Sequence, residues 1–427
     1  MSARPRQPEP FVRGAPYPPT ADIPYPRADP ADIRRLPADV WHAASVPVGV
    51  RLEVVGDAQA IDVAYRTTTG NLGYRGDGAG VTFSVWRGGR QVDEAEAELG
   101  DGLIRLQLGK MVPERPATIY LPEGMLPVVR SLTAVHGEIA PAAPEPRWLA
   151  YGDSSTQGWI ASGPAQAWAA IAARKAGLDL VNMGYAQSGR GDIASAEHLA
   201  ALEADVITIS YGASCWSRVP HNAAMIEVGL DAFLDVVRQG HPETPIVVMS
   251  PVAWPEADHA PNRLGATLHD IRRSVESVTR WRIRDGDLNL ALLCGRDLID
   301  EWYLTDGIYP GDEGHKRIAA AVGKYLFAAR YGSLHTLAMS ALDDDEDGDN
   351  ADPDRADAGA EEPAGGGHGD TDSNADNPLV SEPGWLQSVP PGSDGREGEP
   401  AAAARRRTAR ATPDRPLYRR STTTHAV

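Results

Sequence analysis

The chain has 427 residues, of which 42% are hydrophobic, and a formal net charge of −18. Its length allows two domains and tails, while its charge argues against a nucleic-acid or anionic-membrane partner, because either would need a basic surface. The charge is uneven, with eleven Asp or Glu in residues 343–362 and seven Arg in residues 405–420. The net charge therefore describes the C-terminal tail more than the folded part.

Several other classes of protein are disfavoured by what the sequence lacks. The two cysteines, Cys215 and Cys294, make no disulfide framework. No run approaches the roughly 18 apolar residues of a membrane span, and the Pro- and Arg-rich start has no apolar stretch typical of a secretory signal. We therefore expect a cytoplasmic protein with no membrane partner. No His/Cys spacing suits a metal ion, so we expect no metal and no other cofactor.

Residues 1–43 are rich in Pro and lack periodicity, which predicts a flexible or wrapped leader. Residues 44–143 then consist of short alternating runs separated by Gly, Asp and Pro. Strands are predicted at 50–56, 60–67, 81–89, 103–109, 117–122 and 131–139. Their regular spacing favours a β-sandwich domain of the jelly-roll kind.

The pattern changes after a Pro-rich linker that ends at Pro146. Between 144 and 335, strands that are apolar throughout alternate with helices. The predicted strands are 148–152, 178–183, 205–212, 245–250 and 288–295, and the predicted helices are 165–177, 190–204, 221–239, 262–283 and 312–332. This alternation predicts an α/β domain with three α/β/α layers around a parallel sheet. Low hydrophobicity and charge blocks predict disorder over 336–427.

Polar and glycine-rich loops follow several of these strands. They read "YGDSSTQGW", "NMGYAQSGRGD", "YGASCW" and "TDGIYP". Ser154 falls on the Gly-Asp-Ser turn that opens a helix, where its oxygen can project from the sheet edge. Because ligands bind beyond the carboxyl ends of parallel strands, we expect the four loops to form one site.

The blocks "GDSSTQG" and "DGIYPGDEGH" resemble those of the GDSL, or SGNH, hydrolases, and the similarity extends over roughly residues 145–332. A β-sandwich before such a domain is similar to the layout of some carbohydrate esterases. The resemblance implies an SGNH hydrolase-like fold and a serine esterase. It assigns Ser154 as the nucleophile, Asp306 as the family's aspartate, and Gly189 as the oxyanion-hole glycine, with Gly184 as a rival.

Two positions depart from this family's pattern. Ser214 stands where the family has an oxyanion-hole Asn, and Tyr309 stands where it has the catalytic His. Losing one oxyanion donor costs about 10²–10³ in kcat. Losing a triad member costs about 10⁴–10⁶, and a tyrosine with a pKa of about 10 is a poor proton acceptor at neutral pH.

A histidine elsewhere could replace the missing base. His315 lies six residues beyond Tyr309 and has the side chain best suited to proton transfer near pH 7. The alternative is a packing role, since "PGDEGH" reads as a turn and helix start, and the family often carries a histidine there beside the catalytic one. His221 and His259 are further candidates. Cys215 could be a thiolate nucleophile or a buried inert thiol.

The sequence thus predicts a serine esterase or acyltransferase that acts on an ester of a small molecule or carbohydrate. Three tryptophans that follow strands could supply an aromatic wall or simply pack in the core: Trp159, Trp216 and Trp254. The alternative is a catalytically inactive SGNH-like protein that binds a ligand or partner in the same cleft. A third, weaker interpretation makes the β-sandwich a carbohydrate-binding module.

Overall fold

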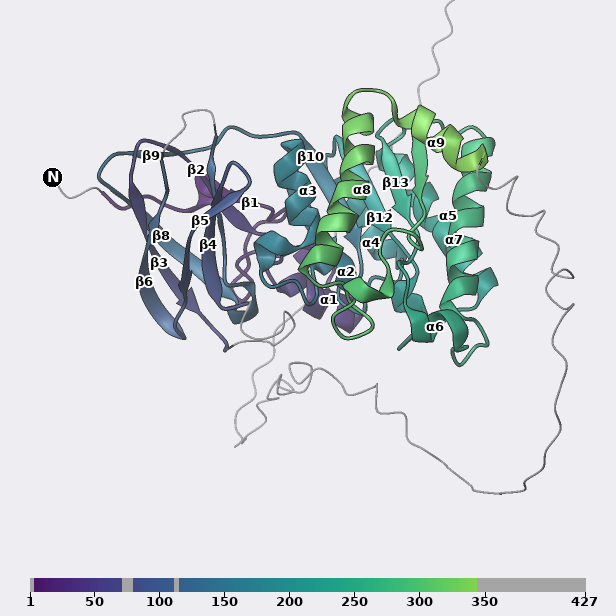
Figure 1. The fold of residues 1–427 in the computed structure, drawn as a ribbon. Helices are drawn as coiled ribbons and strands as arrows, with labels where there is room; N and C mark the ends of the chain where they lie inside the picture. The colour runs from purple at the N-terminus through teal and green to yellow at the C-terminus, as the bar shows by residue number, and fades with distance from the viewer. Residues whose placement is uncertain (1–3, 71–79, 111–114, 344–427) are drawn as a thin grey trace, which may run out of the picture.

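The computed structural model describes residues 4–70, 80–110 and 115–343 (Figure 1). Its N-terminal part holds two antiparallel sheets around one apolar core. One sheet has the order β1-β2-β7-β4-β5, with β9 also paired to β2, and the other has the order β6-β3-β8. The strands are β1 (Val12–Arg13), β2 (Arg51–Gly56), β3 (Ala60–Thr67), β4 (Thr82–Arg87), β5 (Arg90–Glu96), β6 (Gly100–Gln107), β7 (Ala117–Tyr120), β8 (Pro127–Val135) and β9 (Ile139–Pro141). The predicted antiparallel β domain is confirmed.

Strand β5 was not predicted, and its position explains why. It is an edge strand of the larger sheet, and its sequence "RQVDEAE" is exposed along most of its length. A strand that buries neither face needs no apolar alternation, so the periodic signal is missing.

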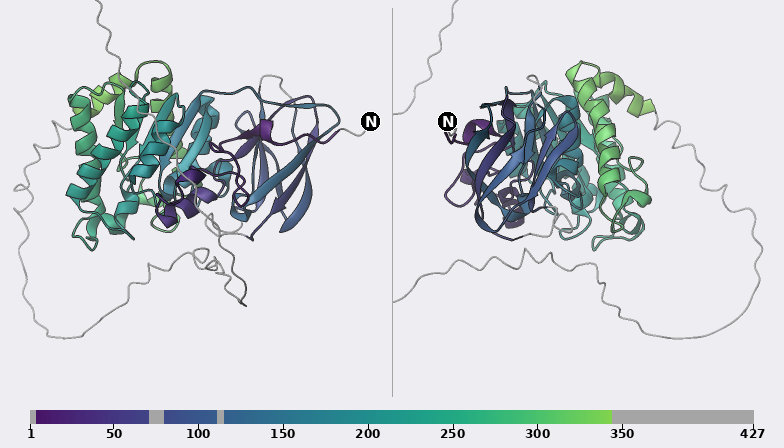
Figure 2. Two further views of the ribbon diagram at one scale, coloured as in Figure 1. Left: turned by 180° about the vertical axis from the view of Figure 1, so that it is seen from behind. Right: turned by 60° about the vertical axis from the view of Figure 1, so that its left-hand side comes forward.

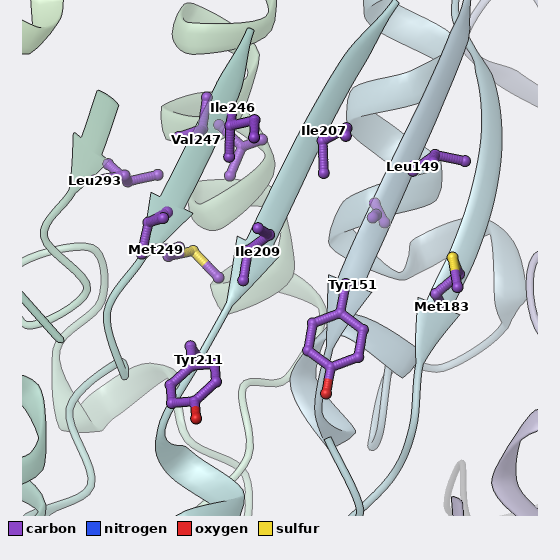
Figure 3. Packing of buried hydrophobic residues seen from close by; sticks show 14 of the residues in the cluster. Leu149, Tyr151, Met183, Ile207, Ile209, Tyr211, Ile246, Val247, Met249 and Leu293 are labelled. Atoms are coloured by element: carbon purple, nitrogen blue, oxygen red, sulfur yellow. The ribbon is translucent and has the colours of Figure 1, made fainter. Parts of the chain in front are cut away.

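The second part is built on a parallel sheet of order β11-β10-β12-β13-β14. These strands are β10 (Arg147–Gly152), β11 (Asp179–Gly184), β12 (Val206–Ser210), β13 (Ile246–Met249) and β14 (Leu290–Leu293). Nearly every residue in them is buried, which is why the sequence runs are continuously apolar. Figure 3 shows the side chains that alternate across this sheet, among them Leu149, Ile207 and Met249.

Helices cover this sheet. Five of them correspond to predicted helices: α3 (Trp168–Ala176), α4 (Ile193–Ala201), α5 (Ala223–Gly240), α7 (Leu268–Arg284) and α8 (Asp312–Arg330). The structure also has α1 (Ala38–Ser45), α2 (Ser154–Gln157), α6 (Pro255–His259) and α9 (Leu334–Asp343), which were not predicted. Helix α3 packs on α8, while α4, α5 and α7 pack in series (Figure 1). In the described ranges, no helix has both the length and the apolarity to cross a membrane.

Several predicted boundaries differ from the structure; for example, β8 spans Pro127–Val135 where a strand was predicted at 131–139. Helix α7 begins at Leu268 rather than near 262, because Thr267 and Asp270 form a reciprocal capping box there. Residues up to Asp343 belong to α9, although the sequence predicted disorder from 336. The rest of that predicted disordered tail, 344–427, lies outside the described residues.

The leader lies against the parallel sheet, between it and the β domain (Figure 2, left). Arg27 is fully buried and donates to the carbonyl oxygens of Asn182 and Gly184, both at 2.8 Å, and of Val46 at 2.6 Å. Its guanidinium also bonds the carbonyl of Ala43. The leader therefore satisfies carbonyl groups at the carboxyl end of β11, next to the loop that begins at Gly184.

A buried ion-pair network joins the two parts of the molecule. Arg51 of β2 donates from Nη2 to Asp179 Oδ1 of β11 at 2.9 Å and from Nε to Glu53 Oε1 at 2.9 Å. It also donates to the carbonyl of Leu180 at 3.0 Å. The β domain is therefore bonded directly to an edge strand of the parallel sheet.

Candidate functional site

Ser154 sits on a sharp turn after strand β10, which lies between β11 and β12 in the parallel sheet. Asp153 caps helix α2, its carboxylate accepting from the Ser155 N–H at 3.0 Å. Gly152 is needed at the end of the strand, because a Cβ there would lie 2.2 Å from Thr156 Oγ1. Ser154 is almost fully buried, yet it lines a cavity whose volume is about 810 Å³. The predicted nucleophile is thus at the carboxyl edge of the sheet, open to a ligand.

The carboxylate beside the nucleophile has an altered proton affinity. Burial raises the pKa of Asp153 to about 6, although backbone N–H groups of Ser155 and Thr156 oppose the shift. The same hydrogen bonds make the carboxylate the N-terminal cap of helix α2. Asp153 lines the cavity, but its main role is to stabilise this turn.

The loop after β11 brings a glutamine, rather than the predicted glycine, to Ser154. Gln187 N–H donates to Ser154 Oγ at 3.0 Å, and Gln187 has φ 57°, in the left-handed region that non-glycine residues seldom adopt. Gly189 N–H instead donates to the Tyr185 carbonyl at 2.9 Å, and Gly184 N–H donates to Asn182 Oδ1 at 2.8 Å. The two predicted glycines therefore have their N–H groups occupied away from Ser154.

Gly189 has a packing role that explains why the position is glycine. A Cβ there would lie 2.2 Å from the Gly152 carbonyl oxygen, so only glycine lets the two loops approach. The sequence does not indicate this role for Gln187 beside Ser154. Its backbone is left-handed, and that conformation is normally expected at glycine rather than glutamine.

Ser214 lines the same cavity from the loop after β12. It lies in a short 3-10 turn, Ala213–Cys215, that begins after Gly212 at φ 114°. Its side chain is nearly fully buried. The structure therefore brings Ser214 to the cavity with Ser154, with a hydroxyl in place of the longer amide that the family resemblance implies.

Tyr309 lines the cavity at the position where the family resemblance implies the general base. The side chains of Ser154 and Gln187 lie near its hydroxyl and lower the pKa of the phenol, but burial outweighs them and raises that pKa above its ordinary value of about 10. At neutral pH the phenol is therefore protonated and is a poor acceptor for the proton of Ser154.

Asp306 supports Tyr309 through the backbone. Its Oδ1 accepts from the N–H groups of Ile308 at 3.0 Å and Tyr309 at 2.8 Å, so it closes a turn that presents the tyrosine to the cavity. The carboxylate is exposed and bonds no imidazole among the described residues. Its position in the chain matches the family's aspartate, but its contacts here are those of a turn residue.

His315 lies in the first turn of α8 and is fully buried. Its Nδ1 accepts from the Trp168 N–H at 3.2 Å, which leaves the proton on Nε2, 3.2 Å from the Trp159 carbonyl oxygen. Both ring nitrogens thus have backbone partners, and His315 does not line the cavity. These contacts match the packing role considered for His315 rather than the role of a general base.

No other histidine in the described ranges lines the cavity. His221 Nδ1 lies 2.8 Å from the Val219 carbonyl oxygen, and His259 is exposed at the end of α6. Cys215 is fully buried, and burial raises the pKa of its thiol to about 12, which disfavours a thiolate nucleophile. In the described ranges no group of three or more His, Cys, Asp and Glu side chains could hold a metal ion.

Aromatic and cationic side chains complete the wall of the cavity. Trp216 and Trp254 both line it and meet edge to face, with ring centroids 5.0 Å apart. Trp159 instead packs against the Tyr309 ring, at 6.0 Å. Arg218 and Arg263 also line the cavity, and the sequence analysis did not identify them because surface arginines carry no distinguishing pattern.

Comparison with known proteins assigns the domain that contains this cavity. The model of the GDSL-like lipase/acylhydrolase family matches residues 150–317. No curated protein sequence matches the chain.

Several solved structures have the same fold. A salicylyl-acyltransferase from a tetracycline biosynthetic pathway is 24% identical with a TM-score of 0.66, covering 78% of this chain and 99% of its own. A candidate GDSL-like lipase from Bacteroides ovatus is 18% identical with a TM-score of 0.65, covering 77% and 98%. An acetyl xylan esterase from Butyrivibrio proteoclasticus is 12% identical with a TM-score of 0.50, covering 78% and 100%.

At these identities the likeness establishes the shared fold, including the β domain in front of the parallel sheet. The family match covers the turn that carries Ser154, the loop that carries Gln187 and the segment that carries Tyr309. The α/β domain, over residues 150–317, therefore belongs to the GDSL-like lipase/acylhydrolase, or SGNH, family, and an antiparallel β domain precedes it.

Proposed function

We propose that this chain binds a small molecule with an acyl or ester group in its SGNH cleft and does not turn it over efficiently. The observation that supports this most directly is that a protonated phenol, Tyr309, lines the cavity with Ser154 where the family resemblance implies the general base. A neutral serine hydroxyl without a proton acceptor is a weak nucleophile. The cavity of about 810 Å³ remains, and its aromatic and polar lining suits a small organic ligand.

The size of the expected loss supports binding over turnover. Removal of a triad member costs about 10⁴–10⁶ in kcat, and removal of an oxyanion donor costs about 10²–10³ more. Ser214 replaces that donor with a shorter side chain, and the N–H that meets Ser154 belongs to Gln187 rather than to either predicted glycine. The costs of changes that act as a unit do not simply multiply, but each change reduces catalysis.

Slow acyl transfer by Ser154 is the second candidate, because Ser154 lines the cavity and has a backbone N–H 3.0 Å from its oxygen. The substrate, an ester of a small molecule or carbohydrate, would then supply the basic group. That group would take the hydroxyl proton as Oγ attacks the ester carbonyl. The alcohol would leave with a proton, and water or a second alcohol would release the acyl group from Ser154.

One set of measurements separates the two candidates. The protein and its Ser154→Ala variant are treated with a fluorophosphonate probe and with p-nitrophenyl acetate, and each is titrated with phenyl acetate while tryptophan fluorescence is followed. We expect equal labelling and equal, near-background hydrolysis in both proteins, with saturable quenching through Trp216 and Trp254. Labelling or turnover that disappears in Ser154→Ala would contradict the binding proposal and support slow acyl transfer.

A further inference from the structure

We propose that the ligand carries a carboxylate, and that Arg218 and Arg263 bind it at the cavity wall. This inference rests on the proposed function, since it specifies the chemistry of the molecule that enters the same cavity. Both guanidinium groups belong to residues that line the cavity with Ser154. Arginine presents a planar set of N–H donors that matches a carboxylate in two parallel hydrogen bonds.

The two arginines come from different loops that are bonded to each other. Arg218 follows β12, and Arg263 lies between α6 and α7. Trp216 Nε1 donates to the Ala260 carbonyl at 3.0 Å, and Asn262 Nδ2 donates to the His221 carbonyl at 2.9 Å. These bonds hold the two loops together along one wall of the cavity.

The turn that carries Arg263 has a well-determined backbone. Asn262 Oδ1 accepts from the N–H groups of Leu264 at 2.9 Å and Ala266 at 3.2 Å. Gly265, at φ 81°, takes the left-handed conformation that closes this turn. A cation on a fixed turn loses less conformational freedom on binding than one on a loose loop, which strengthens the interaction with a ligand.

The surroundings of the arginines favour a molecule with an apolar body and a single negative charge. Trp216 and Trp254 form the aromatic part of the wall next to Val252 and Leu268. Glu256 also lines the cavity and would repel a second negative charge. A monoanionic carboxylate on an aromatic or aliphatic group fits this combination.

The test compares two ligands of nearly equal shape that differ in charge. Calorimetric titrations of the full chain use 4-phenylbutanoate and 4-phenylbutanamide at low ionic strength. We expect the carboxylate to bind at least about tenfold more tightly than the amide, as a charged hydrogen-bonded pair in a partly enclosed site should. Arg218→Gln/Arg263→Gln should reduce this ratio to near one.

Two further variants sharpen the result. Glu256→Gln should tighten binding of the carboxylate a few-fold and leave binding of the amide unchanged, because it removes only a charge. Arg284→Gln, an exposed arginine at the end of α7, should change neither ligand.

Equal binding of the two ligands by the unmodified protein would overturn the carboxylate site and leave the proposed function intact. A charge preference that survives the double substitution would also overturn it. Binding of neither ligand would contradict the carboxylate site and the proposed function together.

Discussion

Ser154 and Tyr309 line the same cavity, and the phenol at position 309 has a low affinity for a proton. An imidazole with a pKa near 6.5 can accept the proton of a serine hydroxyl at neutral pH, whereas a phenol with a pKa above 10 cannot. Burial moves Tyr309 further in this direction. A serine beside this phenol is therefore not activated. An active arrangement would differ from this one by a single side chain, a histidine in place of Tyr309.

Restoring an imidazole at position 309 should produce esterase activity. We expect Tyr309→His to raise Ser154-dependent hydrolysis of p-nitrophenyl acetate by about 10² or more, with a half-maximal rate near pH 6–7, because a neutral imidazole is the active form. Adding Gln187→Gly, which removes a side chain from the cavity lining beside Ser154, and Ser214→Asn, which supplies a longer oxyanion donor, should raise the rate further. Steady-state rates between pH 5 and 9 provide the measurement.

The matched control for this series is Ser154→Ala in the same triple background, which should return hydrolysis to the level of the unmodified protein. If the triple variant folds and binds phenyl acetate but its rate does not depend on Ser154, the assignment of Ser154 as the latent nucleophile is wrong.

Asp153 should make the stability of the protein depend on pH. Its folded-state pKa of about 6 lies above the ordinary value of about 3.9, so its contribution is fully present below pH 4 and is lost as pH rises through 6. The difference between these two pKa values corresponds to roughly 3 kcal/mol. Relative to the unmodified protein, Asp153→Asn should therefore gain about 2–3 kcal/mol in unfolding free energy between pH 4 and 7.5, as measured by urea denaturation.

Asp270 provides a control of opposite sign. Its pKa is lowered by the backbone and side-chain hydrogen bonds of Thr267, so its contribution is present above the ordinary pKa and is lost as pH falls. Asp270→Asn should thus be more harmful at pH 7.5 than at pH 4. A pH-independent effect of Asp153→Asn would show that the buried carboxyl keeps its ordinary pKa.

Among the elements, the segment from Asp306 to the first turn of α8 positions the altered part of the site. Asp306 closes the turn before Tyr309, and His315 fastens α8 to the Trp159 and Trp168 backbone. Trp159 in turn packs on the Tyr309 ring. A histidine close in sequence to the missing base thus stabilises the segment from within instead of facing the cavity.

Replacement of His315 should lower stability rather than affect a proton-transfer step. His315→Ala leaves the buried N–H of Trp168 and carbonyl of Trp159 without this partner, which we expect to cost about 2–4 kcal/mol with the lost packing. Urea denaturation gives the measurement, and His259→Ala, at an exposed site, should stay within about 0.5 kcal/mol.

A packing role and a general-base role for His315 predict different pH dependences of hydrolysis. In the Tyr309→His background, His315→Ala should leave the half-maximal pH of hydrolysis unchanged, measured below the unfolding temperature. Loss of the imidazole-dependent pH profile in that double variant, which still carries the imidazole introduced at position 309, would identify His315 as the base.

At the scale of the whole molecule, the β domain and the parallel sheet share a buried network centred on Arg51. Arg51 bonds Glu53 and Asp179 and is about 5% exposed. Breaking a buried pair by removing one partner leaves an unpaired charge and costs about 3–5 kcal/mol. We therefore expect Arg51→Met to lower the unfolding free energy by that amount.

The control for this substitution is Arg66→Met, which removes an exposed ion pair with Asp101 whose side chains are 51% and 70% accessible. It should cost less than about 1 kcal/mol, because solvent screens the pair. Similar losses in the two variants would mean that the contact between the domains contributes no more than a surface ion pair.

The sequence alone was sufficient for the architecture and for the place of the site. Apolar strands alternating with helices can bury both faces of a parallel sheet in only one general way, and the carboxyl ends of those strands then share an edge. The pattern therefore predicted that Ser154, Ser214 and Tyr309 lie at one edge, and in the structure all three line one cavity; their catalytic assignments remain predictions. These are properties of local pattern, which tertiary contacts did not override.

The tertiary structure decided which groups meet at that edge. Gln187 reaches Ser154 because its backbone adopts a left-handed conformation held by neighbouring loops, and His315 turns inward because two distant backbone groups need a partner. Arg218 and Arg263 line one cavity because their loops are bonded together. Such choices depend on contacts between residues far apart in the chain, and local residue patterns do not encode them.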